Sequence, residues 1–182
     1  MKYLLFFVGA CLLASQALAQ DIYSCRKVHL SFFSEAPLEN IEAKTDQGVS
    51  AINIKTKVVY FKVPVTSFRF KKKLMEEHFN DNYLESEKYP FAEFKGNIQD
   101  AADFRNDGTY PVTVTGTLNI HGVDKNYTEK GTLVVKGNTL NVNATFNVRV
   151  ADHRIKIPSL VVKNVAEVVA ITVQAAYEIV NK

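Results

Sequence analysis

The sequence lacks tryptophan and has only two cysteines, two methionines and five prolines in 182 residues. Cys11 lies in an apolar N-terminal run, so Cys25 is the only cysteine left if that run is removed. A single cysteine cannot form an internal disulfide, which excludes a disulfide-stapled scaffold. We expect Cys25 to be a small buried residue of the first strand, because no local signature of a catalytic thiol accompanies it.

Strong charge of one sign is also missing. The chain has 22 Lys and Arg residues against 19 Asp and Glu residues, a formal net charge of +3. That is too small to indicate a nucleic-acid partner. No low-complexity linker divides the chain, so residues 20–182 are expected to form one domain.

Motifs for metal binding and common catalysis are lacking as well. His29, His121 and His153 do not show metal-ligand spacings such as HxxxH or HxH. The sequence has no Gly-rich phosphate loop, no GxSxG nucleophile elbow and no paired catalytic carboxylates. We therefore expect no metal, no other cofactor and no enzymatic activity.

Residues 1–19 have the pattern of a secretory signal peptide. Lys2 is basic, Tyr3–Leu13 is an apolar run too short to span a bilayer, and Ala17–Ala19 is an A-x-A cleavage site. Lipoprotein processing at Val8–Cys11 is the alternative, but it would leave a short apolar region and discard the A-x-A site. We expect a periplasmic or secreted protein, cleaved after Ala19.

The stretch 58–96 predicts a strand, a short helix and another strand. Its first part alternates apolar and polar residues, and Ser67 interrupts the alternation as a bulge or bend would. Lys71–Phe79 then takes helical spacing, with Leu74, Met75, His78 and Phe79 on one face. A Tyr-Pro dipeptide requires extended backbone before the strand Phe91–Gln99.

Similar alternation predicts six more strands. They are Lys27–Glu35, Val49–Ile54, Tyr110–Ile120, Tyr127–Val135, Leu140–Val150 and Val165–Ile179. Turns or irregular connections are expected at Pro37–Lys44, Asp46–Gly48, Asp103–Gly108, Gly137–Asn138 and Asp152–Pro158. One short helix cannot cover the apolar faces of so many strands, whereas closure of the sheet buries them and removes both edges. The sequence therefore predicts an all-β protein, an eight-stranded antiparallel barrel with a short helical insertion after the third strand. A β-sandwich is the alternative.

Such a barrel either fills its interior with side chains or holds one slender ligand. Several inward positions are small, namely Gly96, Gly116, Gly131, Ala144 and Ala175. They either relieve strain where strands bend or leave room for an acyl or prenyl chain. The pattern alone does not decide between these interpretations.

The stretch around the predicted helix resembles a known family. The matching residues are, in order, Ser67, Phe68, Leu74, Met75, His78, Phe79, Glu85, Ser86, Lys88, Tyr89, Pro90, Phe94 and Gly96. They resemble the ordered motif of the YceI-like family of bacterial lipid-binding proteins, and the resemblance extends over nearly all of the chain beyond the signal peptide. It implies a lipocalin-like barrel that holds a polyisoprenoid or a fatty-acid-like amphiphile.

We therefore predict an exported binding protein with a long-chain apolar ligand inside a hollow barrel, and the helix Lys71–Phe79 as a lid or plug at one end. The residues expected to bind the ligand are Phe61, Val63, Phe68, His78, Phe79, Phe94, Val114, Leu118, Phe146, Val148, Glu167 and Ile171. A filled barrel with a structural or partner-binding role is one alternative, and an enzyme acting on an apolar substrate is another. Transient membrane contact and a homodimer are both left open by the sequence.

Two acidic residues, Glu129 and Glu167, lie on the apolar side of their strands. A position at the barrel rim would explain them, because acidic side chains are rarely buried without a partner. The sharper hypothesis is that one of them anchors a ligand head group or pairs with Arg149 or Arg154.

Overall fold

The computed structural model describes residues 21–35, 40–157 and 166–180. The predicted signal peptide, with its alternative lipoprotein site, lies outside these ranges, as do residues 37–39 of the predicted connection at Pro37–Lys44. Within the described ranges, no helix is long and apolar enough to cross a membrane.

Most of the described chain is β-strand. The strands are β1 (Ile22–Ser34), β2 (Ile41–Asn53), β3 (Val58–Pro64), β4 (Arg69–Phe70), β5 (Phe91–Ile98), β6 (Gly108–Ile120), β7 (Val123–Lys136), β8 (Thr139–Arg149) and β9 (Val168–Ile179). The helical elements are η1 (Val65–Ser67), α1 (Lys73–His78), η2 (Phe79–Tyr83) and η3 (Val150–His153). The interruption that the sequence indicated at Ser67 is therefore a short 3-10 turn, which leads the chain from β3 toward α1.

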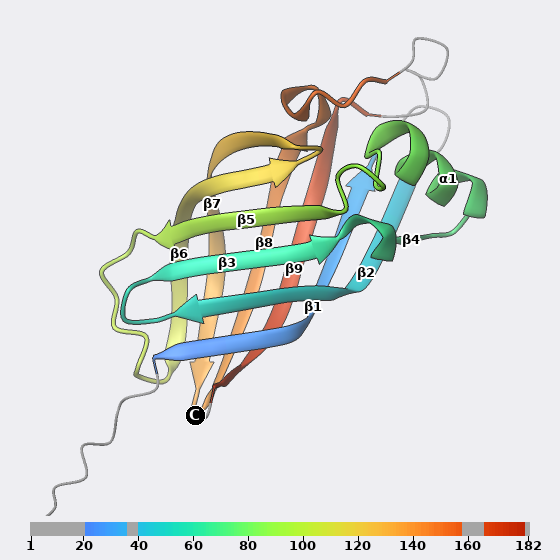
Figure 1. The fold of residues 1–182 in the computed structure, drawn as a ribbon. Helices are drawn as coiled ribbons and strands as arrows, with labels where there is room; N and C mark the ends of the chain where they lie inside the picture. Colours follow the sequence, from blue (N-terminus) through green and yellow to red (C-terminus); the bar gives the residue numbers. More distant parts are fainter. Residues whose placement is uncertain (1–20, 36–39, 158–165, 181–182) are drawn as a thin grey trace, which may run out of the picture.

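The eight long strands close into one antiparallel barrel (Figure 1). They run in the order β1-β9-β8-β7-β6-β5-β3-β2, and β2 pairs back with β1. The two-residue β4 pairs with β2 beyond the end of β3, next to α1. The predicted eight-stranded barrel, with a helical insertion after its third strand, is confirmed.

The first hairpin differs from the sequence-based expectation. The turn predicted at Asp46–Gly48 is wrong, because these residues lie within β2. The connection predicted at Pro37–Lys44 is wrong from Ile41 on, because β2 begins at that residue. The β1–β2 register is irregular around Val28, which lies opposite Gly48. A Cβ on Gly48 would come within 2.8 Å of Leu30 Cδ1. This glycine therefore permits close packing beside a bulge rather than a chain reversal.

The end of the barrel away from α1 is filled with side chains. Tyr177 is fully buried there, and Cys25 belongs to the same cluster, which confirms its expected burial. Phe104 comes from the predicted polar loop Asp103–Gly108, yet it is only 1% exposed and packs edge-on against Tyr110. The loop therefore contributes an aromatic side chain to this end of the core.

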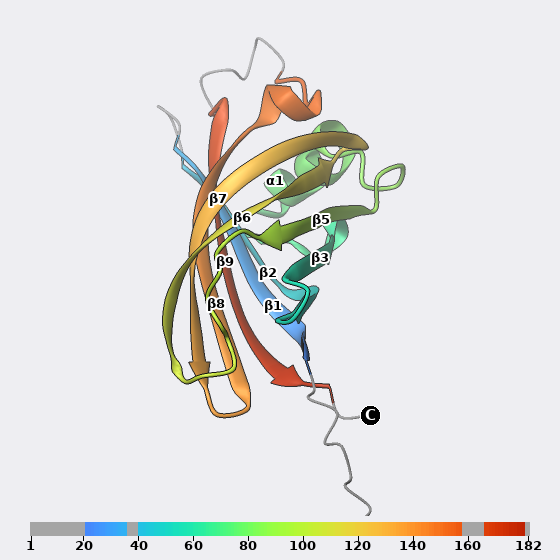
Figure 2. The same cartoon turned by 90° about the vertical axis from the view of Figure 1, so that its left-hand side faces the viewer.

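At the opposite end, β7 and β8 separate before either strand ends. Their ladder stops at the pair Gly131 and Ala144. Beyond that pair, β7 continues to pair with β6, and β8 continues to pair with β9. Figure 2 shows β7 arching away from β8 in this region. The inner face of the barrel is therefore wider at this end than at the filled end.

Candidate ligand-binding cavity

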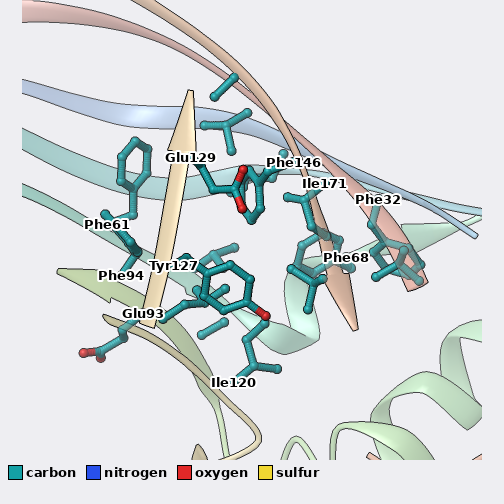
Figure 3. A pocket seen from close by; sticks show the side chains of 18 of the residues that line it. Phe32, Phe61, Phe68, Glu93, Phe94, Ile120, Tyr127, Glu129, Phe146 and Ile171 are labelled. Carbon is teal, nitrogen blue, oxygen red and sulfur yellow. The ribbon is translucent and has the colours of Figure 1, made fainter. Parts of the chain in front are cut away.

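An apolar cavity of about 530 Å³ occupies the α1 half of the barrel and reaches the filled core at Ile52, Ile98 and Leu133. All eight long strands contribute lining residues, together with α1 and η2, and nearly all of these side chains are aliphatic or aromatic (Figure 3). The volume lies within the range of roughly 300–1,000 Å³ that is usual for small-molecule sites. The barrel is thus filled in one half and hollow in the other.

The residues predicted to bind a ligand, apart from Glu167, line this cavity. They are Phe61, Val63, Phe68, His78, Phe79, Phe94, Val114, Leu118, Phe146, Val148 and Ile171. Glu167 is exposed just before β9, and its backbone carbonyl accepts a hydrogen bond from the amide of Val150 at 3.0 Å. For the residues that lie in strands, alternation identified the inner face, whereas Phe68, His78 and Phe79 lie between β3 and β5 outside the long strands. The contact of all these residues with a ligand stays a prediction.

Four phenylalanines form a cluster in the cavity wall beside α1. The ring centroids of Phe32, Phe68 and Phe70 lie 5.5, 5.8 and 5.0 Å, respectively, from that of Phe79. Two of the rings, Phe32 and Phe70, were not among the predicted site residues, although both lie in alternating apolar stretches. The chain just after α1 is therefore held against the cavity by aromatic packing.

The apolar face predicted for the helix is only partly used. Met75 and His78 line the cavity, and His78 is exposed to solvent. Leu74, expected on the same face, is 61% exposed, and no residue of α1 is buried. Helical spacing placed these residues together, but the six-residue helix lies across the end of the barrel and not over its core.

The small inward residues differ in what they make room for. Ala175 is part of the filled core. Gly96 and Gly116 accommodate the ring of Phe94, since a Cβ on either would lie within 2.7 Å of Phe94 Cζ. Gly131 and Ala144, in contrast, line the cavity. Only the second pair leaves space that a ligand could occupy.

Few charged side chains reach the cavity. Lys62 pairs with Glu93 at 2.8 Å and lies over the Phe91 ring, and Figure 3 shows Glu93 pointing away from the interior. The carboxylate of Glu129 projects inward beside Phe146 (Figure 3). Within the described ranges it forms no hydrogen bond or ion pair, so the pairing considered with Arg149 or Arg154 is not found there.

A hydrogen-bonded group of side chains supports the wall beside Glu129. His153 is fully buried, with Nδ1 3.1 Å from the carbonyl oxygen of Val123 and Nε2 3.1 Å from the hydroxyl of Tyr127. Burial lowers the pKa of His153, which keeps its ring neutral. His121 Nδ1 donates to the carbonyl of His153, and its Nε2 lies 2.5 Å from Glu85 Oε2. These histidines position η3 against β7.

No metal-binding group is formed by the parts of the chain that the structure covers: they contain no set of three or more His, Cys, Asp or Glu side chains close enough to hold an ion. His121 and His153 are engaged with carbonyl, hydroxyl and carboxylate oxygens instead.

Comparison with known proteins agrees with the fold. The sequence model of the family described as "YceI-like domain" matches residues 27–177, which is most of the chain. The chain belongs to the YceI-like family. No match was found among curated proteins.

Solved structures share the architecture at low sequence identity. A polyisoprenoid binding domain from Saccharophagus degradans, implicated in plant cell wall breakdown, superposes with a TM-score of 0.75 at 16% identity, covering 88% of this chain and 99% of that one. BcnA from Burkholderia cenocepacia superposes with a TM-score of 0.66 at 17% identity, covering 82% of this chain and 95% of BcnA. A YceI protein from Campylobacter jejuni gives 0.64 at 14% identity, covering 81% and 90%. At such identities these similarities establish the YceI-like fold alone.

Proposed function

We propose that this protein is an exported binding protein that holds one long-chain apolar molecule, a polyisoprenoid or a fatty-acid-like amphiphile, inside the barrel. The observation that carries the proposal is the apolar cavity of about 530 Å³ in the α1 half. An empty apolar space of this size forfeits the packing contacts that a filled interior would make. A hydrocarbon chain would restore those contacts, and each methylene it buries contributes about 0.8 kcal/mol.

Membership of the YceI-like family and the polyisoprenoid-binding neighbour support the same ligand class. Export is supported by the signal-peptide pattern of residues 1–19. A binding role is favoured over an enzymatic one, because the lining is almost entirely hydrocarbon and offers little chemistry for bond making or breaking.

Native mass spectrometry of the purified mature protein, followed by organic extraction, tests the proposal. We expect a bound species whose extract contains a long alkyl or prenyl chain. An apo mass that persists after incubation with a membrane lipid extract would contradict it and favour a structural or partner-binding role. A control is the same measurement on Val114→Arg, in which a cationic side chain replaces a lining residue.

A further inference from the structure

Glu129 is an isolated charge on an otherwise apolar wall. Its partner across the β6–β7 ladder is Val114, the next inward residue of β7 is Gly131, and Figure 3 places Phe146 beside it. Among the residues described, none donates a hydrogen bond to its carboxylate or pairs with it. Glu129 is partly buried, and a carboxylate beside apolar groups is costly wherever neither water nor another donor reaches it. The position therefore points to an occupant that supplies one.

The nearby hydroxyl of Tyr127 has its proton committed elsewhere. The carbonyl of Val123 can only accept, so Nδ1 of His153 carries the ring proton and Nε2 accepts. Tyr127 therefore donates to Nε2, across 3.1 Å. Toward any further partner, the phenolic oxygen can only accept. Both polar groups at this part of the wall thus call for a donor.

Cationic side chains near the cavity do not neutralise the charge of the Glu129 carboxylate. Lys62 is engaged with Glu93 and the Phe91 ring. Lys130 also contributes to the lining, but it is exposed and forms no ion pair with Glu129. His78 is exposed at the α1 end of the cavity. A phosphate or carboxylate head group beside Glu129 would meet like charge without a counter-ion.

The place of Glu129 in the barrel suits a head group rather than the middle of a chain. It lies just beyond the last pair of the β7–β8 ladder, where the two strands have separated. The filled half of the barrel lies on the opposite side of that pair. A chain with its polar end here can extend along the apolar lining toward α1.

We propose that Glu129 binds the polar end of the ligand, and that this end is an O–H or N–H donor, such as the hydroxyl, amide or amine of a long-chain alcohol, amide or amine. Phosphate and carboxylate ends are disfavoured. This inference rests on the proposed function, because it requires an apolar chain in the cavity.

Displacement of the fluorescent hydrocarbon diphenylhexatriene by ligands with one chain and different heads tests the inference. The series is hexadecane, hexadecanol, hexadecylamine, hexadecanoate and hexadecyl phosphate. We expect the alcohol and the amine to bind about tenfold or more tightly than the phosphate, as hydrogen bonds to a charged group permit. Glu129→Gln should remove most of this preference, Glu129→Asp should keep part of it, and hexadecane should bind all variants alike.

Glu178→Gln is the matched control, since Glu178 is exposed on β9, outside the cavity. Circular dichroism and thermal melts establish that each variant folds. Equal affinity for alcohol and phosphate, or an unchanged order of affinities in Glu129→Gln, would overturn the inference while leaving the proposed function intact. If neither the hydrocarbon probe nor any member of the series bound, the proposed function would fail and the inference with it.

Discussion

The ring of Phe94 lies against Gly116 on the neighbouring strand: a Cβ on Gly116 would come within 2.6 Å of Phe94 Cζ and 2.5 Å of the carbonyl oxygen of Lys95. Because part of this overlap is with backbone, a rotamer change of Phe94 cannot relieve it. We expect Gly116→Ala to lower the free energy of unfolding by about 1–3 kcal/mol, the usual range for overpacking. Urea unfolding measures the change.

A second glycine provides the control for that experiment. Gly137 has a φ of +54°, and a Cβ added to it would meet nothing within 4 Å. Asn tolerates this left-handed conformation, so Gly137→Asn should change stability by only a few tenths of a kcal/mol. Equal losses in both variants would show that steric overlap at Phe94 is not the cause.

The buried hydroxyl of Tyr177 is a second point of sensitivity. It lies 2.8 Å from Ser50 Oγ, which itself donates to the carbonyl of Tyr60. Tyr177→Phe removes this buried hydrogen bond and should cost about 1–2 kcal/mol in urea unfolding. Tyr110→Phe is the control, because the Tyr110 hydroxyl bonds to the Asn106 carbonyl at an exposed site. A larger loss of unfolding free energy in Tyr110→Phe than in Tyr177→Phe would refute a stabilising role for the buried hydrogen bond.

Burial should also make the fold sensitive to alkali. Desolvation raises the pKa of Tyr177 well above 10.0, its ordinary value. Above pH 10, Tyr177 of the unfolded chain releases its proton, whereas the native state retains it. The contribution of protonated Tyr177 to the free energy of unfolding is therefore complete below pH 10 and declines as the pH rises above 10. Urea midpoints measured across this range should fall, and less steeply in Tyr177→Phe. Burial also raises the pKa values of Tyr23 and Tyr83, so part of the slope should persist.

Phe79 should control how fast a ligand leaves. Its ring contacts three other phenylalanines of the cavity wall, and each such aromatic pair contributes about 0.5–1.5 kcal/mol. Phe79→Ala should therefore accelerate release of a bound hydrocarbon probe about tenfold in stopped-flow chase experiments. Leu74→Ala, at an exposed position of α1, should leave the rate unchanged. An unchanged rate in Phe79→Ala would show that ligand leaves by another route.

Val114→Arg should fold but fail to retain the ligand. Val114 lines the cavity opposite Glu129, so the new guanidinium can pair with that carboxylate and occupy the apolar space. Thr115→Arg is the control on the same strand, since the Thr115 hydroxyl bonds to the exposed Thr128. Bound lipid is measured by extraction and native mass spectrometry. A folded Val114→Arg that retains lipid would place the ligand elsewhere.

Strand periodicity predicted the barrel and most of the cavity wall, because alternation reports directly which side chains face inward. It failed where long-range packing decides. Asp46–Gly48 has turn-like composition, but β1 pairs with Thr45 before it and with Gly48 at its end, which keeps the segment in a strand. His29 also bonds to Asp46 at 2.7 Å. Phe104 was assigned to a polar loop, since nothing in the local sequence shows that it folds back over the barrel end.

Glu129 and Glu167 show the same limit of prediction from strand periodicity. Glu129 and Glu167 looked equivalent in the sequence, yet one projects into the cavity and the other is exposed before β9 begins. Periodicity assigns a face only within a strand, and Glu167 precedes the strand that the structure assigns from Val168. The hydrogen bonds of His153 join residues remote in sequence, so no local pattern could have predicted them.

The contrast between the filled and hollow halves has a consequence for how such a protein can change. The side chains of the filled end fix the barrel independently of cargo, so the apo form has a core of its own. Six core residues also line the cavity, namely Ile52, Val59, Ile98, Val112, Leu133 and Val173, so substitutions there change the fold and the cavity together. Wall positions outside that core, such as Phe68 and Met75, can change the shape of the cavity without removing the interactions that hold the core. Selection for a different apolar ligand is therefore least constrained at the α1 end.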